Sequence, residues 1–298
     1  MLHVTNGTSV SLKESGLGGE VLPWMDVLHE GPVPGGLDAA ELRRVRGSFL
    51  DAENPGRAPA ELELAGRDAA LESCQEIALW FEHDLYDQLQ LIQILDRLGG
   101  GTANVSLICT DRYLGPMTGA DLAALWPKRR RVSDAEYALA EAAWLAFCGP
   151  DPSAIETLLA RDTSALPFLA GALRRHLQQF PSVENGLART ERQILQVAAG
   201  GRRTFDSLFA AERAMEERAF MGDTSLARWV RGLKDCRNPL LALDAGVYRV
   251  TSLGREALAG SVDHLRLNGI NRWLGGVHLT VGQPVWRWDE RAGRLRLK

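Results

Sequence analysis

Residues 77–81 form a run of five apolar residues, and the polar triplet Glu82, His83 and Asp84 follows it directly. So short an apolar run is typical of a strand that is buried on both faces of a sheet. Residues 84–98 then place leucine and isoleucine at helical spacing. A buried strand that leads into such a helix indicates a unit of a mostly parallel sheet, and therefore an α/β fold.

The same alternation extends through the first part of the chain. Strand-like and helix-like patterns take turns there: strands at residues 2–5, 20–24, 77–81 and 105–109, and helices at residues 37–50, 62–74 and 84–98. Proline and glycine at residues 55–59 and 99–101 interrupt the helical patterns. We predict that residues 1–132 form a Rossmann-like domain around a mostly parallel sheet.

The rest of the chain has a different character, and a chain of 298 residues is long enough for at least two domains. Residues 133–185 are helical in pattern and predict a helical connector. Residues 186–262 predict three helices and a hairpin around the turn at residues 244–246, which is the outline of a winged-helix-like domain. Residues 263–298 predict a short β tail, with Trp286 and Trp288 alternating, that docks on the first domain.

Charge divides the chain into unlike parts. Residues 1–185 contain 15 basic and 26 acidic residues, whereas residues 186–298 contain 19 basic and 12 acidic residues. The acidic part argues against a broad nucleic-acid surface, and the basic part permits one. No apolar run approaches the ~18 residues of a membrane helix, and the N-terminus lacks the pattern of a signal peptide. We expect a cytoplasmic protein with no membrane partner.

Polar residues gather where predicted strands end, which is where ligands bind in open parallel sheets. The first such cluster contains Asn6, Gly7, Thr8 and Ser9. A glycine with small hydroxyl residues can present backbone N–H groups to a phosphate, although neither standard nucleotide-binding motif is present. The alternative is that Thr8 or Ser9 simply caps a helix.

Two further clusters combine histidine with carboxylates at strand ends: Asp26, His29 and Glu30, and Glu82, His83 and Asp84, with Tyr86, Asp87 and Gln88 close behind. The histidines and carboxylates of the two clusters can act as acid and base or bind a divalent metal, and Tyr86 and Gln88 are candidates for ligand binding. The identity of any metal stays unknown, because no ordered ligand motif such as HExxH occurs. The alternative is that Asp84 caps its helix while Glu82 or Asp87 lies in solvent.

A fourth cluster lies within residues 263–278 and is rich in glycine and asparagine. Arg272 could bind a carboxylate or phosphate, with Trp273 as a stacking surface and His278 nearby. The alternative is structural, because a tail that docks on the first domain needs tight turns of this kind. Both interpretations stay open.

Four stretches of the sequence are distinctive: HVTNG at residues 3–7, WMDVLHEGP at 24–32, WFEHDLYDQL at 80–89 and NGINRWLGGVH at 268–278. Together they resemble a bacterial family designated domain of unknown function 1835, with its companion C-terminal domain. In that family aspartate is commoner where this chain has Thr8 and Asn271. The resemblance implies an intracellular bacterial protein, and it implies no particular reaction.

Two classes of function fit these observations. The first is an enzyme or ligand-binding protein that acts on a phosphorylated or nucleotide-like small molecule; as an enzyme it would be a transferase or hydrolase that uses histidine and carboxylate acid-base chemistry. The second is a DNA-binding transcriptional regulator whose α/β domain senses a ligand. In a third interpretation the winged-helix-like domain serves only for interaction, for example in a homodimer.

Overall fold

The computed structural model describes residues 1–53, 59–99 and 101–298, so the predicted interruptions at 55–59 and 99–101 lie partly outside the described residues. The chain divides into two compact units. The first comprises Met1–Leu173 together with Trp273–Val277, and the second comprises Arg174–Arg272 together with His278–Lys298. Most of the predicted helical connector therefore belongs to the first unit, and only residues 273–277 of the predicted tail group with that unit.

A five-stranded sheet forms the centre of the first unit, as the alternating pattern predicts. Its strands are β1 (Leu2–Thr5), β2 (Glu20–Pro23), β3 (Glu76–Phe81), β4 (Asn104–Cys109) and β5 (Arg130–Arg131). The strand order is β2-β1-β3-β4-β5; β1 to β4 are parallel, and the short β5 runs antiparallel to β4. The prediction of a mixed α/β fold with a mostly parallel sheet is confirmed.

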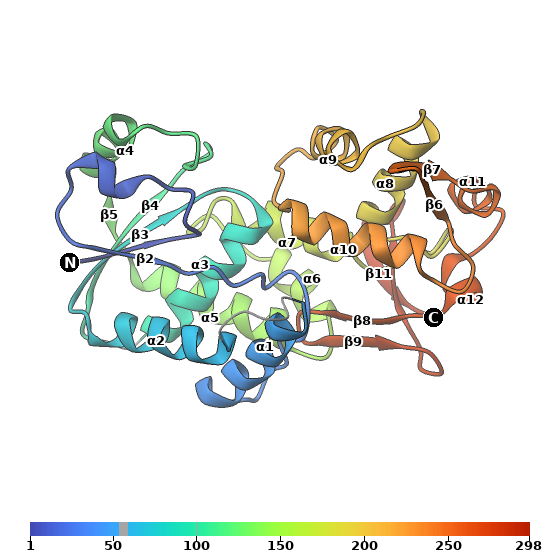
Figure 1. Ribbon diagram of the computed structural model, residues 1–298. Coiled ribbons are helices and arrows are strands. Elements are labelled where there is room, and N and C mark those ends of the chain that lie inside the picture. The colour runs from blue at the N-terminus through green and yellow to red at the C-terminus, as the bar shows by residue number, and fades with distance from the viewer. Residues whose placement is uncertain (54–58, 100) are drawn as a thin grey trace. The chain divides into compact units, whose positions relative to one another are not determined.

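Helices cover both faces of this sheet (Figure 1). The longer ones are α1 (Ala39–Glu53), α2 (Ala60–Ser73), α3 (Leu85–Leu98) and α5 (Asp134–Cys148). The shorter ones are η1 (Leu12–Ser15), α4 (Gly119–Leu125), η2 (Trp126–Lys128) and α6 (Ser153–Leu159). The next helix, α7 (Leu169–Leu177), contains the boundary between the two units. In Figure 1 α4 lies on one side of the sheet and α2, α3 and α5 lie on the other.

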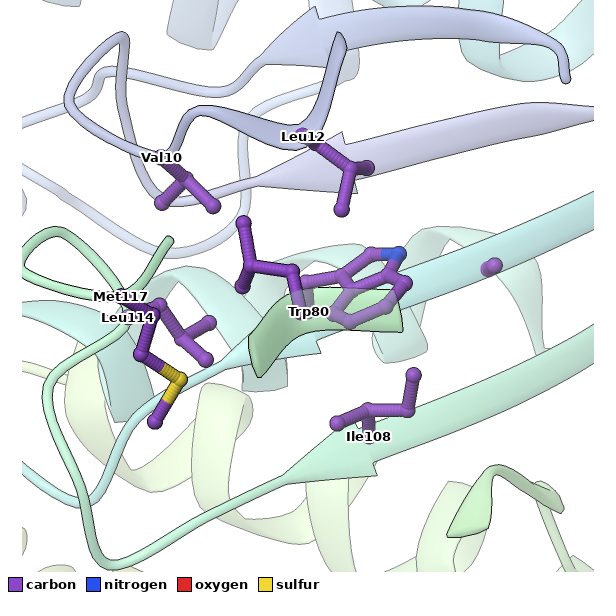
Figure 2. Close-up of a cluster of buried hydrophobic side chains, with 8 residues drawn as sticks. Val10, Leu12, Trp80, Ile108, Leu114 and Met117 are labelled. Atoms are coloured by element: carbon purple, nitrogen blue, oxygen red, sulfur yellow. The ribbon is translucent and has the colours of Figure 1, made fainter. Parts of the chain in front are cut away.

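Strand β3 is buried on both of its faces, because every residue from Ile77 to Phe81 is buried. Figure 2 shows Trp80 among apolar side chains from the segment before η1, from η1 and β4, and from the segment that leads into α4. These side chains are Val10, Leu12, Ile108, Leu114 and Met117. The apolar run therefore anchors the strand between two layers, and the polar residues that follow it emerge at the edge of the sheet.

The second unit combines helices with small antiparallel sheets. Its helices are α8 (Arg189–Ala199), α9 (Phe205–Arg213), α10 (Asp223–Lys234), α11 (Ser252–Leu258) and α12 (His264–Asn268). Its strands form the pairs β6 (Leu241–Asp244) with β7 (Val247–Val250), and β10 (Trp286–Asp289) with β11 (Arg294–Leu297). A further two-stranded sheet consists of β8 (Asn271–Leu274) and β9 (Val277–Thr280), and its residues 273–277 belong to the first unit.

Two glycines between β8 and β9 lie in the first unit, where they approach the end of α5 closely. The backbone N–H of Gly276 donates to the carbonyl of Phe147 at 3.0 Å, and the carbonyl of Gly275 accepts from Val33 at 2.9 Å. A Cβ atom on Gly276 would lie only 1.7 Å from the carbonyl oxygen of Cys148. The glycine pair that the sequence singles out is thus required by backbone packing.

No helix in the described part of the chain has both the length and the apolar character that crossing a bilayer requires.

Candidate functional site

The carboxyl ends of β1 and β3 lie side by side, and the strand order reverses between them. From β1 the chain moves outward to β2, and it then crosses back to β3 on the opposite side of β1. In open α/β sheets such a reversal leaves a crevice between the loops, and this is the usual place for a ligand. Asn6 follows β1 and Glu82 follows β3, so two of the predicted clusters meet at this edge.

Three carboxylates are brought together there, from Glu82, Asp84 and Asp87. One oxygen of each lies within 4.8 Å of the others. Their residues are only 4%, 4% and 0% exposed, respectively. The expected alternative, in which Glu82 or Asp87 lies in solvent, is therefore wrong, because the ends of both strands and the first turn of α3 enclose these side chains.

Backbone N–H groups hold each carboxylate in place. Leu114 donates to Glu82 Oε1 at 2.6 Å, and the N–H of Glu82 donates to Asp87 Oδ1 at 2.7 Å. The N–H of Asp87 donates to Asp84 Oδ1 at 3.0 Å, so Asp84 also caps α3 as the alternative interpretation expected. Asp84 is therefore both the cap of α3 and a member of the acidic cluster.

Asn6 links the end of β1 to this cluster. Its Nδ2 donates to Asp87 Oδ2 at 2.8 Å, and its backbone carbonyl accepts from the hydroxyl of Tyr86 at 3.1 Å. The side-chain oxygen of Asn6 is buried and has no hydrogen-bond partner among the described residues. The three carboxylates offer oxygen atoms of the kind that a hard divalent cation prefers, and the Asn6 amide group adjoins them at Asp87.

The electrostatics of the cluster follow from burial and from like charges. Burial raises the pKa of Asp87 well above its ordinary range, and the neighbouring carboxylates of Asp84 and Glu82 raise it further. Burial also raises the pKa of Tyr86, so its hydroxyl stays protonated and donates to Asn6. Such a cluster is stable only with positive charge added, either as a proton or as a cation.

His83 and Gln88 border the cluster. The His83 ring is buried and lies 5.0 Å from the ring centre of Tyr113 and 6.0 Å from that of Phe168. Gln88 donates to the carbonyl of Glu82 at 2.6 Å and thereby fixes the end of β3. Gln88 thus supports the end of β3, and His83 packs against two aromatic rings beside the carboxylates that flank it in sequence.

The predicted cluster of Asp26, His29 and Glu30 lies against α1 and the first turn of α3. Asp26 is buried and accepts from Arg46 at 2.7 Å, with Arg67 at 4.0 Å. The carbonyl of Glu30 also accepts from Arg46, at 2.6 Å, and the His29 ring lies 5.9 Å from the ring of Tyr86. Arginine therefore neutralises Asp26, so this carboxylate serves to hold the loop against α1 and is not a candidate acid or base.

The segment Gly7, Thr8 and Ser9 continues from Asn6 in a turn. The hydroxyl of Thr5 donates to the carbonyl of Gly7 at 3.0 Å, and Thr8 and Ser9 are exposed. Only the four-residue 3-10 helix η1 follows, and its N-cap residue is Ser11. The alternative interpretation, a helix cap by Thr8 or Ser9, is therefore wrong, and the expected helix dipole is limited to one short turn.

Arg272 and His278 belong to the second unit. Arg272 donates to Glu191 at 2.5 Å and lies over the ring of Trp229 at 4.4 Å. Its positive charge helps to lower the pKa of the buried Glu191 despite the opposing effect of burial. His278 forms a hydrogen bond with the side chain of Asn271 at 2.8 Å.

Sequence reasoning did not place Asp87 among the site residues. Asp87 is the most deeply buried of the three acids and is the one that accepts from both strand ends. The available signal was its spacing, because an aspartate three residues after a capping aspartate lies in the same helical turn. That turn begins at a strand end, where a buried acid has to be hydrogen-bonded or its charge neutralised.

No protein-family model matches the chain, and a search of curated proteins found no relative. The resemblance described above therefore stays a prediction.

Proposed function

We propose that the protein binds and acts on a phosphate-bearing or nucleotide-like small molecule at the carboxyl edge of the first unit's sheet. The observation that carries this proposal is the position of the acidic cluster and Asn6, at the point where the strand order reverses between β1 and β3. Loops from both strands can close around a ligand there without disturbing the hydrogen bonds of the sheet.

The proposed chemistry is a transfer or a hydrolysis. His83 is the candidate for proton transfer, because an imidazole changes its charge near neutral pH and this one adjoins the carboxylates in sequence. Backbone groups and hydroxyls of Gly7, Thr8 and Ser9 are the candidates for binding the anionic end of the molecule. Glu82, Asp84 and Asp87 would repel a phosphate unless their own charge is neutralised.

Thermal-shift measurements with nucleotides, sugar phosphates and inorganic phosphate test the proposal. We expect at least one of these compounds to raise the melting temperature of the wild type. Glu82→Gln and His83→Ala should reduce that shift, whereas Glu72→Gln, on the exposed surface of α2, should leave it unchanged. If every compound that shifts the wild type shifts both site variants equally, the ligand binds elsewhere and the site is wrong.

The finer description of the second unit as a winged-helix-like domain is also a proposal. It is supported by the order α8, α9, α10, β6, β7, and by residue Arg203, which pairs with Tyr248 of β7 as the first strand of such a domain would. DNA binding remains the second candidate function through α10, which carries Arg228, Arg231 and Lys234. A gel-shift titration without salt-dependent affinity would exclude it.

A further inference from the structure

We propose that Glu82, Asp84 and Asp87, with the side-chain oxygen of Asn6, bind one divalent cation of the magnesium or manganese type. This inference deepens the proposed function and rests on it for the identity of the second ligand, a phosphate group. The cation site itself is argued from the protein side chains alone.

The buried aspartates of the first unit differ in whether an arginine neutralises their charge. Asp26 pairs with Arg46, and Asp68 pairs with arginines of α1, α2 and α3 at 2.6 to 3.1 Å. Asp87 is fully buried and forms no ion pair with a lysine or arginine in the described part of the chain. Because a buried negative charge must be offset, the contrast indicates that the positive charge beside this carboxylate comes from a proton or a bound cation, and not from a lysine or arginine side chain.

Asn6 provides independent evidence for a ligand. Its amide group lies at the cluster, because Nδ2 donates to Asp87 Oδ2 at 2.8 Å. The oxygen of the same amide is buried without a hydrogen-bond partner among the residues described, and the whole residue is 8% exposed. A buried polar atom of this kind is costly unless something binds it. A cation shared with the carboxylates would satisfy it.

The chemistry of the four side chains selects the type of ion. All of them offer oxygen, and none offers a thiolate or an imidazole. Carboxylate and amide oxygens suit magnesium, manganese and calcium, whereas zinc prefers nitrogen and sulfur. Backbone N–H groups of Glu82, Asp87 and Leu114 already orient one oxygen of each carboxylate, so less order has to be created when the ion binds.

A bound cation would also explain how an acidic cluster accepts a phosphate. Magnesium usually keeps several water ligands and bridges one or two carboxylates to the phosphate of a substrate. In this arrangement the cation offsets the negative charge of Glu82, Asp84 and Asp87, and the phosphate replaces some of its water.

The test is a calorimetric titration of the chelator-treated full chain with manganese chloride, with no phosphate compound present. We expect binding of about one ion per chain in the wild type, and affinities at least about tenfold weaker for Asp87→Asn and Glu82→Gln. Glu72→Gln serves as the matched control and should bind as the wild type does. Circular dichroism confirms that each variant is folded, and two independent site variants guard against a single folding defect.

The outcomes separate the cation from the proposed function. If the wild type binds no manganese at millimolar concentration, or if folded Asp87→Asn and Glu82→Gln bind as tightly as the wild type, the cation site is wrong. If manganese binds as expected but no phosphate compound binds with or without it, the cation site stands and the proposed function fails. If a nucleotide binds equally well with chelator and with manganese, the proposed function stands and the role of the cation is overturned.

Discussion

The side-chain amide of Asn6 donates to Asp87 Oδ2 at 2.8 Å, and this hydrogen bond joins two residues that are 81 positions apart in the sequence. Asn6 directly follows the first strand of the sheet, and Asp87 lies in the first turn of the helix after β3. The two strands are hydrogen-bonded in parallel, so this bond lies at their common edge. It turns two separate sequence clusters into one site.

Replacing Asn6 tests the strength of this link. Asn6→Ala removes the donor to a buried carboxylate oxygen, so we expect a loss of about 1 to 3 kcal/mol in the free energy of unfolding. Urea denaturation monitored by circular dichroism measures it. Asn104→Ala changes the same residue type at an exposed position on β4 and should alter stability little. Equal stabilities of the two variants would contradict the link.

The ion pair between Arg46 and Asp26 makes a separate prediction. Arg46→Ala would leave Asp26 buried at 1% exposure without its closest cation and would remove hydrogen bonds to the carbonyls of Val27 and Glu30. We expect a loss of about 3 to 5 kcal/mol in the free energy of unfolding. Arg44→Ala, on the exposed face of the same helix, should cost less than about 0.5 kcal/mol. If both variants lose only a similarly small free energy of unfolding, the burial of Asp26 does not depend on its ion pair with Arg46.

Gly276 is expected to tolerate no side chain. Its added Cβ would overlap the carbonyl oxygen of Cys148, so Gly276→Ala must displace backbone and should cost at least about 1 to 3 kcal/mol in urea denaturation. Gly66→Ala, in helix α2 where an added Cβ meets nothing within 4 Å, should instead stabilise the protein by about 0.5 to 1 kcal/mol. A neutral Gly276→Ala variant would mean that the close approach is not maintained.

Glu212 in the second unit predicts a dependence of stability on pH. Burial raises its pKa to about 7, with a further contribution from Glu216. The folded state therefore holds an extra proton between about pH 4 and about pH 7, and stability falls as pH rises through this window. The wild type should lose free energy of unfolding on the order of 3 kcal/mol as pH rises through this window, and Glu212→Gln should abolish that loss. Urea denaturation between about pH 4 and pH 8 measures both.

The matched control for this pH series is Glu256→Gln, an exposed residue of α11. It should retain the pH dependence of the wild type. A Glu212→Gln variant with the same slope as this control would show that Glu212 titrates normally in the folded protein.

The local elements of the first unit could be predicted from the sequence because periodicity is a local property. The apolar run before Glu82 and the helical spacing after Asp84 correctly predict β3 and α3. The strand order could not be predicted, since it depends on which long-range pairings bury the most surface. The position of Asn6 beside Asp87 follows from that strand order, so it could not be predicted from the sequence either.

The predicted site was only partly recovered for the same reason. Asp26 looks like a catalytic acid in the sequence, and its arginine partners come from helices 20 and 41 residues further along. Arg272 looks like a ligand-binding residue, and its partner Glu191 is 81 residues away. Whether a charged residue serves structure or chemistry thus depends on tertiary neighbours that sequence spacing does not show.

The most direct measurement is anomalous diffraction from crystals of the full chain soaked in manganese chloride. We predict one strong anomalous peak about 2.1 Å from carboxylate oxygens of Glu82, Asp84 and Asp87, at the carboxyl ends of β1 and β3. A well-ordered cluster with no peak, or with manganese bound only elsewhere on the chain, would contradict the assignment of this edge as a cation-dependent ligand site.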